Sequence, residues 1–145
     1  MTLILFTLCL ALPIATTFIH YESLRAISTF IPRLSQPGRL RVLIAIFAIF
    51  IIHIGEISIY AIAYDFLREE HGLGNFGGQF TDTFLTFFYF SAETFTSVGF
   101  GDIYPTGPLR IVCGIEALNG LLLLGWSASF TFIYMEHFWR VDVQK

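Results

Sequence analysis

The chain has 145 residues, of which 55% are hydrophobic, 17% aromatic and only 13% charged. Soluble domains carry about 25% charged residues, so this composition indicates a single-domain membrane protein and excludes an ordinary soluble one. The formal net charge of −3, without a basic run, gives no sign of a nucleic-acid partner. Cys9 and Cys113 lie in apolar runs, which favours small buried side chains over a disulfide or metal ligands.

The first 20 residues are predicted to form a membrane-spanning helix. Residues 2–19 form an apolar run, interrupted by Pro13 and a few threonines, that is just long enough to cross a bilayer. A signal peptide is the alternative. The run lacks the Lys or Arg of a signal peptide's leading region, and no small-residue cleavage pattern follows it closely, so we favour a retained helix over residues 1–20.

Residues 21–40 are predicted to form a cytoplasmic linker. Apolar residues recur there three or four positions apart, at Leu24, Ile27, Ile31 and Leu34. This spacing, with polar residues between, is typical of a helix that lies on the membrane surface. The turn-forming residues 35–38 end the pattern. An irregular linker is the alternative.

Two further segments precede the most informative stretch. Residues 41–67 are apolar for longer than a span requires, so they are predicted to cross the membrane. Residues 68–80 are polar and rich in glycine, which indicates an exposed loop. A short helix is predicted over residues 81–95, because Thr81 or Asp82 can cap its first turn. It is too short to span, so it should enter the membrane and turn back.

In Thr96-Ser97-Val98-Gly99-Phe100-Gly101-Asp102, two glycines alternate with larger residues. Glycine reaches backbone dihedral angles closed to other residues, so the alternation lets successive carbonyl oxygens point the same way. A line of oxygens at fixed spacing can replace the water that a dehydrated cation gives up. An ordinary turn in a loop is the alternative interpretation.

Residues 97–102 resemble the Thr-Val-Gly-Tyr-Gly-Asp signature of potassium channels, with Ser97 for Thr and Phe100 for Tyr. The resemblance extends through residues 89–95, 103–105 and 110–130, to small bacterial potassium channels of the two-transmembrane-plus-pore-loop (ion channel 2) superfamily. It implies an all-α membrane protein with three transmembrane helices, the first being an addition to the superfamily pattern. A re-entrant pore helix and a selectivity filter then lie between the second and third helices of a tetrameric pore.

On this resemblance, residues 41–140 form the pore domain and residues 136–145 a short cytoplasmic tail. The domain then consists of an outer helix (41–67), a turret (68–80), a pore helix (81–95), a filter (96–102) and an inner helix (109–135). The implied function is passive, potassium-selective conduction through a homotetramer in contact with membrane lipids, without enzymatic activity or a cofactor. The permeant K⁺ would be held by the carbonyl groups of Ser97, Val98, Gly99 and Phe100.

Three residues before the filter are predicted to support it. Glu93 matches a carboxylate that lies behind the filter in related channels, so we expect it to be partly protonated and to brace Asp102. The alternative is a carboxylate facing water at the outer vestibule. Tyr89 and Phe90 stand where many channels carry two tryptophans, and Phe100 lacks the hydroxyl that ties the filter to the pore helix. The aromatic support must therefore be rewired here.

Four polar residues fall within predicted spans, where ionisable groups are expensive. These are His53, Glu56, Glu116 and Asn119. We consider three roles for His53 and Glu56: an interhelical network with Glu116 or Asn119, a proton-sensitive gate, and a metal site for which two ligands are too few. Gly120 is the candidate hinge of the inner helix, with close helix packing as the alternative. The other histidines, His20, His71 and His137, are assigned no role.

The basic residues predict the orientation. Arg25, Arg33, Arg39, Arg41, Arg140 and Lys145 fall on one side of the predicted spans, and Arg68 and Arg110 on the other. The larger group should be cytoplasmic, which places the C terminus inside and the filter mouth outside a cell membrane. The alternative functions are a weakly selective cation channel, a potassium transporter subunit and a membrane enzyme or metal-binding protein. Such transporter chains carry four pore repeats with one filter glycine, whereas this chain has one repeat with two.

Overall fold

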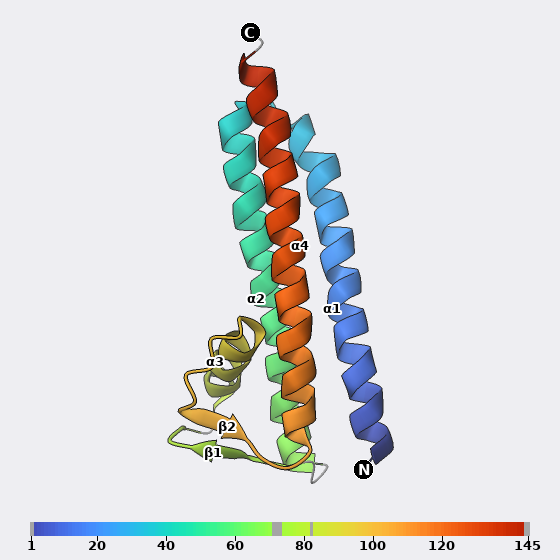
Figure 1. Cartoon of the computed structure of the whole chain (residues 1–145), viewed down its shortest axis with the longest axis vertical. Coiled ribbons are helices and arrows are strands. Elements are labelled where there is room, and N and C mark those ends of the chain that lie inside the picture. The colour runs from blue at the N-terminus through green and yellow to red at the C-terminus, as the bar shows by residue number, and fades with distance from the viewer. Residues whose placement is uncertain (1, 71–73, 82, 144–145) are drawn as a thin grey trace.

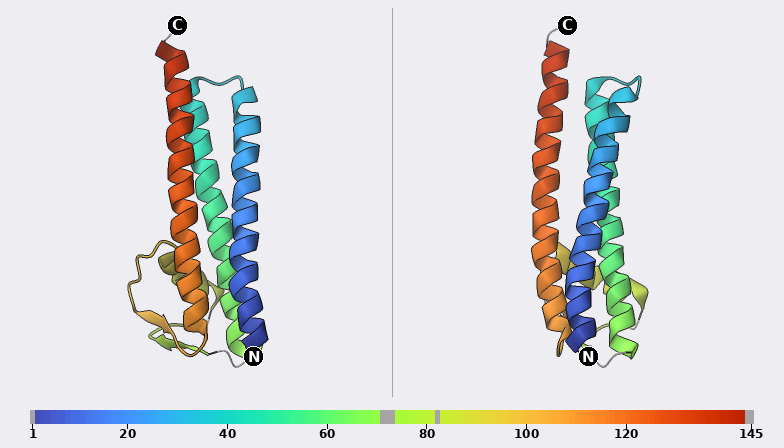
Figure 2. Two further views of the ribbon diagram at one scale, coloured as in Figure 1. Left: turned by 45° about the vertical axis from the view of Figure 1, so that its right-hand side comes forward. Right: turned by 90° about the vertical axis from the view of Figure 1, so that its right-hand side faces the viewer.

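The computed structural model describes residues 2–70, 74–81 and 83–143. Its elements are α1 (Thr2–Phe30), a 3-10 turn η1 (Ile31–Arg33), α2 (Gly38–Glu70), β1 (Phe76–Gly78), α3 (Phe84–Phe95), β2 (Ile103–Pro105) and α4 (Leu109–Val143). The long helices α1, α2 and α4 run side by side, and the short α3 and the strand pair lie at the end where the N terminus is found (Figure 1, Figure 2). The all-α class is confirmed.

Three helices are long and apolar enough to cross a membrane: Leu3–Arg33, Gly38–Leu67 and Leu109–His137. Their outer faces carry large apolar side chains that a single chain leaves uncovered, such as Phe47 and Ile51, each 66% exposed. Contact with lipid gives such residues an apolar environment. The helix α3 has 12 residues and is roughly 18 Å long, which is too short for the hydrocarbon core of about 30 Å.

The first helix is longer than expected. It continues without a break to Phe30, so residues 21–30 extend the span and do not form a separate surface helix. Leu24, Ile27 and Ile31 are buried in one cluster with residues of α2 and with Tyr134 of α4. The spacing that was interpreted as a lipid-facing stripe therefore marks a contact between helices.

The ends of α4 and α3 also differ from the predicted ones. The helix α4 continues through most of the predicted tail, to Val143. The helix α3 begins at Phe84 rather than residue 81, and its first residue follows Thr83, whose side chain makes no capping hydrogen bond. Thr81 lies outside the helix, and the other predicted cap, Asp82, lies outside the described residues.

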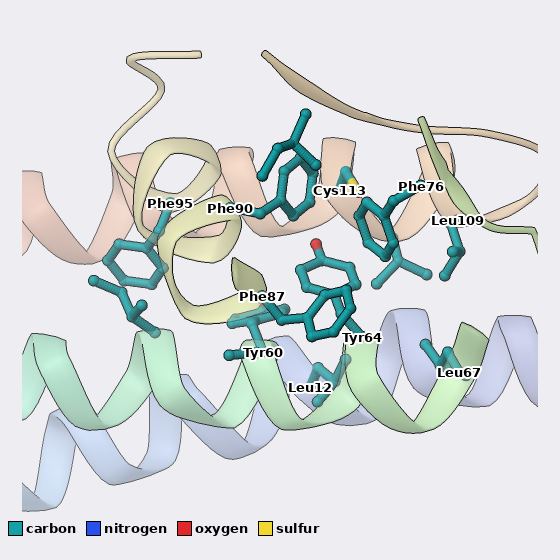
Figure 3. Close-up of a cluster of buried hydrophobic side chains, with 14 of the residues drawn as sticks. Leu12, Tyr60, Tyr64, Leu67, Phe76, Phe87, Phe90, Phe95, Leu109 and Cys113 are labelled. Carbon is teal, nitrogen blue, oxygen red and sulfur yellow. The ribbon is translucent and has the colours of Figure 1, made fainter. Parts of the chain in front are cut away.

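An aromatic core holds α3 against the long helices. Phe87, Phe90 and Phe95 of α3 are at most 3% exposed and belong to one cluster with residues from α1, α2 and α4. Figure 3 shows their rings directed toward Tyr60 and Tyr64 of α2 and toward α4. Each fully buried large side chain contributes roughly 1.5–3 kcal/mol, so this cluster holds α3 in place against α1, α2 and α4, which are here called the frame.

The strands β1 and β2 pair antiparallel, with Phe76 opposite Pro105 and Gly78 opposite Ile103. This pair was not predicted, because three-residue strands show no measurable alternation. Gly77 leaves room for the ring of Tyr104, since a Cβ there would lie 2.5 Å from that ring. The pair ties the predicted turret to the segment that follows Asp102.

Candidate functional site

Residues 96–102, here called the filter loop, leave the end of α3 in an alternating backbone conformation. The φ angles of Ser97, Gly99 and Gly101 are +58°, +56° and +79°. Among the described residues Ser97 is the one non-glycine with a positive φ, so Val98 and Phe100 between them have the opposite sign. This alternation is what two glycines in this pattern were expected to permit.

Three consecutive amide groups of the filter loop, those of Val98, Gly99 and Phe100, donate to Glu93. The N–H groups of Val98 and Gly99 donate to the Glu93 carbonyl oxygen at 2.9 and 3.3 Å, and Phe100 N–H donates to its Oε2 at 2.9 Å. Within the described part of the chain, no hydrogen bond to a carbonyl oxygen of residues 97–101 is found. All seven residues of the loop are exposed in a single chain. The chain itself thus provides hydrogen-bond acceptors for these amide groups, whereas the carbonyl oxygens of residues 97–101 have no donor among the described residues.

Glu93 is buried, with 5% of its surface exposed, so it does not face water at an outer vestibule. Its burial raises the pKa of the carboxyl group, the hydrogen bond from Phe100 opposes this, and the nearby charge of Asp102 raises it further. The direction agrees with the expected partial protonation. The brace itself is at Phe100, and no direct hydrogen bond joins Glu93 to Asp102.

Tyr89 supports the outer end of the loop. Its hydroxyl group donates to the carboxylate of Asp102 at 3.1–3.2 Å, and its ring stacks on Phe100 with centroids 6.3 Å apart and planes 4° apart. Phe90, the other half of the predicted pair, instead packs edge-on against Tyr64 and Phe76 in the core. The hydrogen bond that ties the loop to α3 therefore comes from the hydroxyl group of Tyr89, and Phe100 itself has no hydroxyl group.

Thr96 and Gly120 lie at the other end of the loop, where it leaves α3. The Thr96 hydroxyl donates back to the carbonyl oxygen of Ala92 at 2.7 Å, within the last turn of α3. At the same level Gly120 of α4 lies against the backbone of Phe95, where an added Cβ would be 2.9 Å from the Phe95 Cα. The helix α4 runs through Gly120 without a break, so this glycine is in close packing here, and the hinge stays a prediction.

His53 and Glu56 meet different partners from those predicted. Glu56 accepts hydrogen bonds from His20 Nδ1 at 2.9 Å and from His53 Nδ1 at 2.8 Å. The Nε2 atoms of His20 and His53 lie 3.3 and 3.0 Å from the Ser127 hydroxyl oxygen. We call these four buried residues the polar ring. His20, which was given no role, is fully buried, and its ligand atom lies within 4.8 Å of those of His53 and Glu56, so these three residues could hold a metal ion.

Glu116 and Asn119 form two separate groups. Glu116 accepts hydrogen bonds from Tyr64 of α2 and Ser91 of α3. Asn119 donates to the hydroxyl oxygens of Thr16 at 2.7 Å and Tyr60 at 3.2 Å. The predicted network of His53 and Glu56 with Glu116 or Asn119 is therefore wrong in its partners, because Glu116 and Asn119 bond to other residues of α1, α2 and α3. Thr16 and His20, four positions apart in an apolar helix, were the sequence signal of this buried polar face.

Comparison with known proteins adds two findings. Residues 40–137 match the family model described as an ion channel. A two-pore potassium channel 4 of Arabidopsis thaliana is 36% identical over 64 residues, which are 43% of this chain and 21% of that protein. The match thus spans about a fifth of the relative's length. No solved structure matches at a significant level.

Proposed function

The chain belongs to the ion channel family, and from this premise we propose that it forms a potassium-selective pore by assembling as a homotetramer. The observation that carries the proposal is the one-sided hydrogen bonding of the filter loop. Three of its amide groups donate to Glu93, whereas the carbonyl oxygens of residues 97–100 accept no hydrogen bond among the described residues and so remain available to an ion. Four such loops around an axis would surround each dehydrated K⁺ with oxygens.

The assembly follows from the same exposure. Irregular backbone survives at membrane depth only where protein or a water-filled cavity surrounds it. In one chain Val98 and Phe100 are 57% and 70% exposed, so a single chain does not provide that enclosure. Three further copies of the loop would supply it, and K⁺ would take the place of the missing hydrogen-bond donors.

Charge placement supports an orientation in a cell membrane. Arg33 and Arg39 flank the connection between α1 and α2, at the end of the molecule away from α3 (Figure 1). Cytoplasmic loops carry the excess of basic residues. The C terminus, which lies at that same end, would then be cytoplasmic, and the filter mouth would face outward.

Reconstitution of the purified protein alone into liposomes tests this function. With a K⁺ gradient across the membrane and Na⁺ added on the low-K⁺ side to balance it, the reversal potential should lie close to the potassium equilibrium potential, and native mass spectrometry should give four chains. A reversal potential near zero would indicate the weakly selective cation channel instead. A monomer without current would contradict the pore altogether.

A further inference from the structure

The polar ring contains the donor atoms of a metal site. His20 comes from α1, and His53 and Glu56 come from one turn of α2. The ring is at most 8% exposed at every member. Two imidazoles and a carboxylate are the protein ligands of one common type of zinc site, in which a fourth position stays open. The third ligand, which the spacing of His53 and Glu56 could not provide, is thus supplied by the packing of α1 on α2.

The distances suit a single ion. One ligand atom from each of the three residues lies within 4.8 Å of the others. Ligands around a tetrahedral zinc ion are roughly 3.3 Å apart, given bonds of about 2.0–2.1 Å. The three atoms therefore already lie near the spacing that the ligands of one ion require.

Hydrogen-bond capacity also favours an ion. With both histidines neutral and both Nδ1–H groups donating to Glu56, both Nε2 atoms are acceptors, and Ser127 has only one hydroxyl hydrogen to share between them. A cation held by the two Nδ1 atoms reverses this, because each Nε2 then carries the hydrogen. The Ser127 oxygen has two lone pairs and can accept both, as the partner of a metal-bound histidine usually does.

We propose that His20, His53 and Glu56 bind a divalent transition-metal ion such as Zn²⁺, with Ser127 of α4 orienting the two imidazoles. Imidazole ligands select such ions over K⁺, Mg²⁺ and Ca²⁺, which prefer oxygen. The bound ion would join α1 to α2 within one chain. It would lie beside the pore helix, since the His53 ring contacts the ring of Phe95 with centroids 5.8 Å apart. The site does not depend on which ion the filter selects.

Calorimetric titration of the metal-stripped, purified full chain with Zn²⁺ tests the proposal. One ion per chain should bind and raise the thermal unfolding midpoint. His20→Gln and Glu56→Gln should each abolish this binding. His137→Gln is the matched control, because it removes a histidine from an exposed position of α4 and should leave binding unchanged. Ser127→Ala should bind about 10–100-fold more weakly, as expected when the partner of a metal-bound histidine is lost.

Binding that is absent, that survives in both ring variants, or that His137→Gln removes would overturn the proposal. A spectrum of the unmodified protein with Co²⁺ covers the case in which ring variants fail to fold. A tetrahedral site in the protein should give intense visible absorption. The weak spectrum of hydrated, octahedral Co²⁺ would contradict the site.

Discussion

The filter loop and the polar ring differ in where their polar groups find partners. Every residue of the loop is exposed, and the carbonyl oxygens of residues 97–101 accept no hydrogen bond within the described part of the chain. Every residue of the ring is buried, and each bonds to another member of the ring. One chain thus contains a complete helical frame and, on the proposed function, only part of the conduction site. Changes in the loop should therefore alter conduction, and changes in the frame should alter the folding of each chain.

Gly99→Ala should have the largest effect on the loop side of this comparison. The φ of Gly99 is +56°, and L-residues pay about 1–2 kcal/mol in this region, once per chain of the assembly. An added Cβ meets no atom within 4 Å in one chain, so the effect is on backbone direction rather than crowding. We expect potassium flux into liposomes to fall to background, with the helical circular dichroism unchanged.

The control is Gly55→Ala in α2, where an added Cβ also meets nothing within 4 Å and the backbone is helical. It should conduct normally. Normal potassium current in Gly99→Ala would mean that the alternating backbone is not needed for conduction.

Gly120→Ala tests the frame. The new Cβ would lie 2.8 Å from the carbonyl carbon of Phe95, so α4 must move away from α3, and overpacking of this kind costs about 1–3 kcal/mol. The thermal midpoint in detergent should fall. Gly125→Ala, which meets no atom within 4 Å, should leave it unchanged. Equal midpoints for the two variants would contradict close packing as the role of Gly120.

Glu93 joins the two regions, because it is buried in the frame and accepts a hydrogen bond from the loop. Glu93→Ala leaves the Phe100 amide without its acceptor, at a cost of about 1–3 kcal/mol per chain. We expect faster loss of current during sustained recording. Glu93→Gln keeps an acceptor oxygen and should behave like the unmodified chain. Equally fast loss of current in both variants would show that the carboxylate charge, not the hydrogen bond, supports the loop, and an unchanged current in Glu93→Ala would contradict the support.

The pKa of Glu93 also predicts a pH dependence. Its pKa is raised in the folded chain, mainly by burial, so the unfolded chain releases this proton at lower pH than the folded chain does. The contribution to stability is fully present below about pH 4.5 and is lost as pH rises through the raised value. The thermal midpoint should therefore fall across this window. In Glu93→Gln this part of the slope should vanish, and an identical slope would contradict the assignment.

Tyr89→Phe should have the smallest effect. It removes a hydrogen bond to Asp102 that is exposed in one chain, worth about 1 kcal/mol, and keeps the ring stacked on Phe100. Loss of current should accelerate by a few fold. Tyr104→Phe is the matched control, since its ring packs on Gly77 and no hydrogen bond from its hydroxyl group is found among the described residues. Equal rates of current loss in both variants would mean that the hydrogen bond from Tyr89 to Asp102 does not support the loop.

Much of the architecture could be predicted because it depends on local signals. Three long apolar runs predicted three spanning helices, and the glycine alternation after residue 96 predicted the alternating backbone of residues 97–101. These features require only the chain's own composition and backbone preferences. Helix ends were less predictable, since α1 continues to Phe30 through contacts with α2 that its own sequence does not specify.

The rest depended on contacts between residues that are distant in the sequence. His20 lies 36 positions from Glu56, so its role became visible only when α1 packed on α2. The pairing of β1 with β2 likewise joins Phe76 to Pro105, and neither segment is long enough to show a strand pattern. The hydrogen-bond partner of Glu93 could not be identified from the sequence, because Phe100, seven positions later, and Asp102, nine positions later, fit equally well. In the structure the backbone of the loop brings the N–H group of Phe100 to the Glu93 carboxylate.

The strand pair has a mechanical consequence for the filter loop. Before the loop, Phe95 is fully buried, and after it Ile103 is 5% exposed and paired with a strand whose Phe76 is buried in the aromatic core. The loop is therefore a short segment whose two ends are both held by buried residues. When both ends of a segment are fixed, a rotation of one peptide plane must be compensated by an opposite rotation of the adjacent peptide plane. Transitions between conducting and non-conducting shapes should accordingly proceed by paired crankshaft flips, with little displacement of the outer rim.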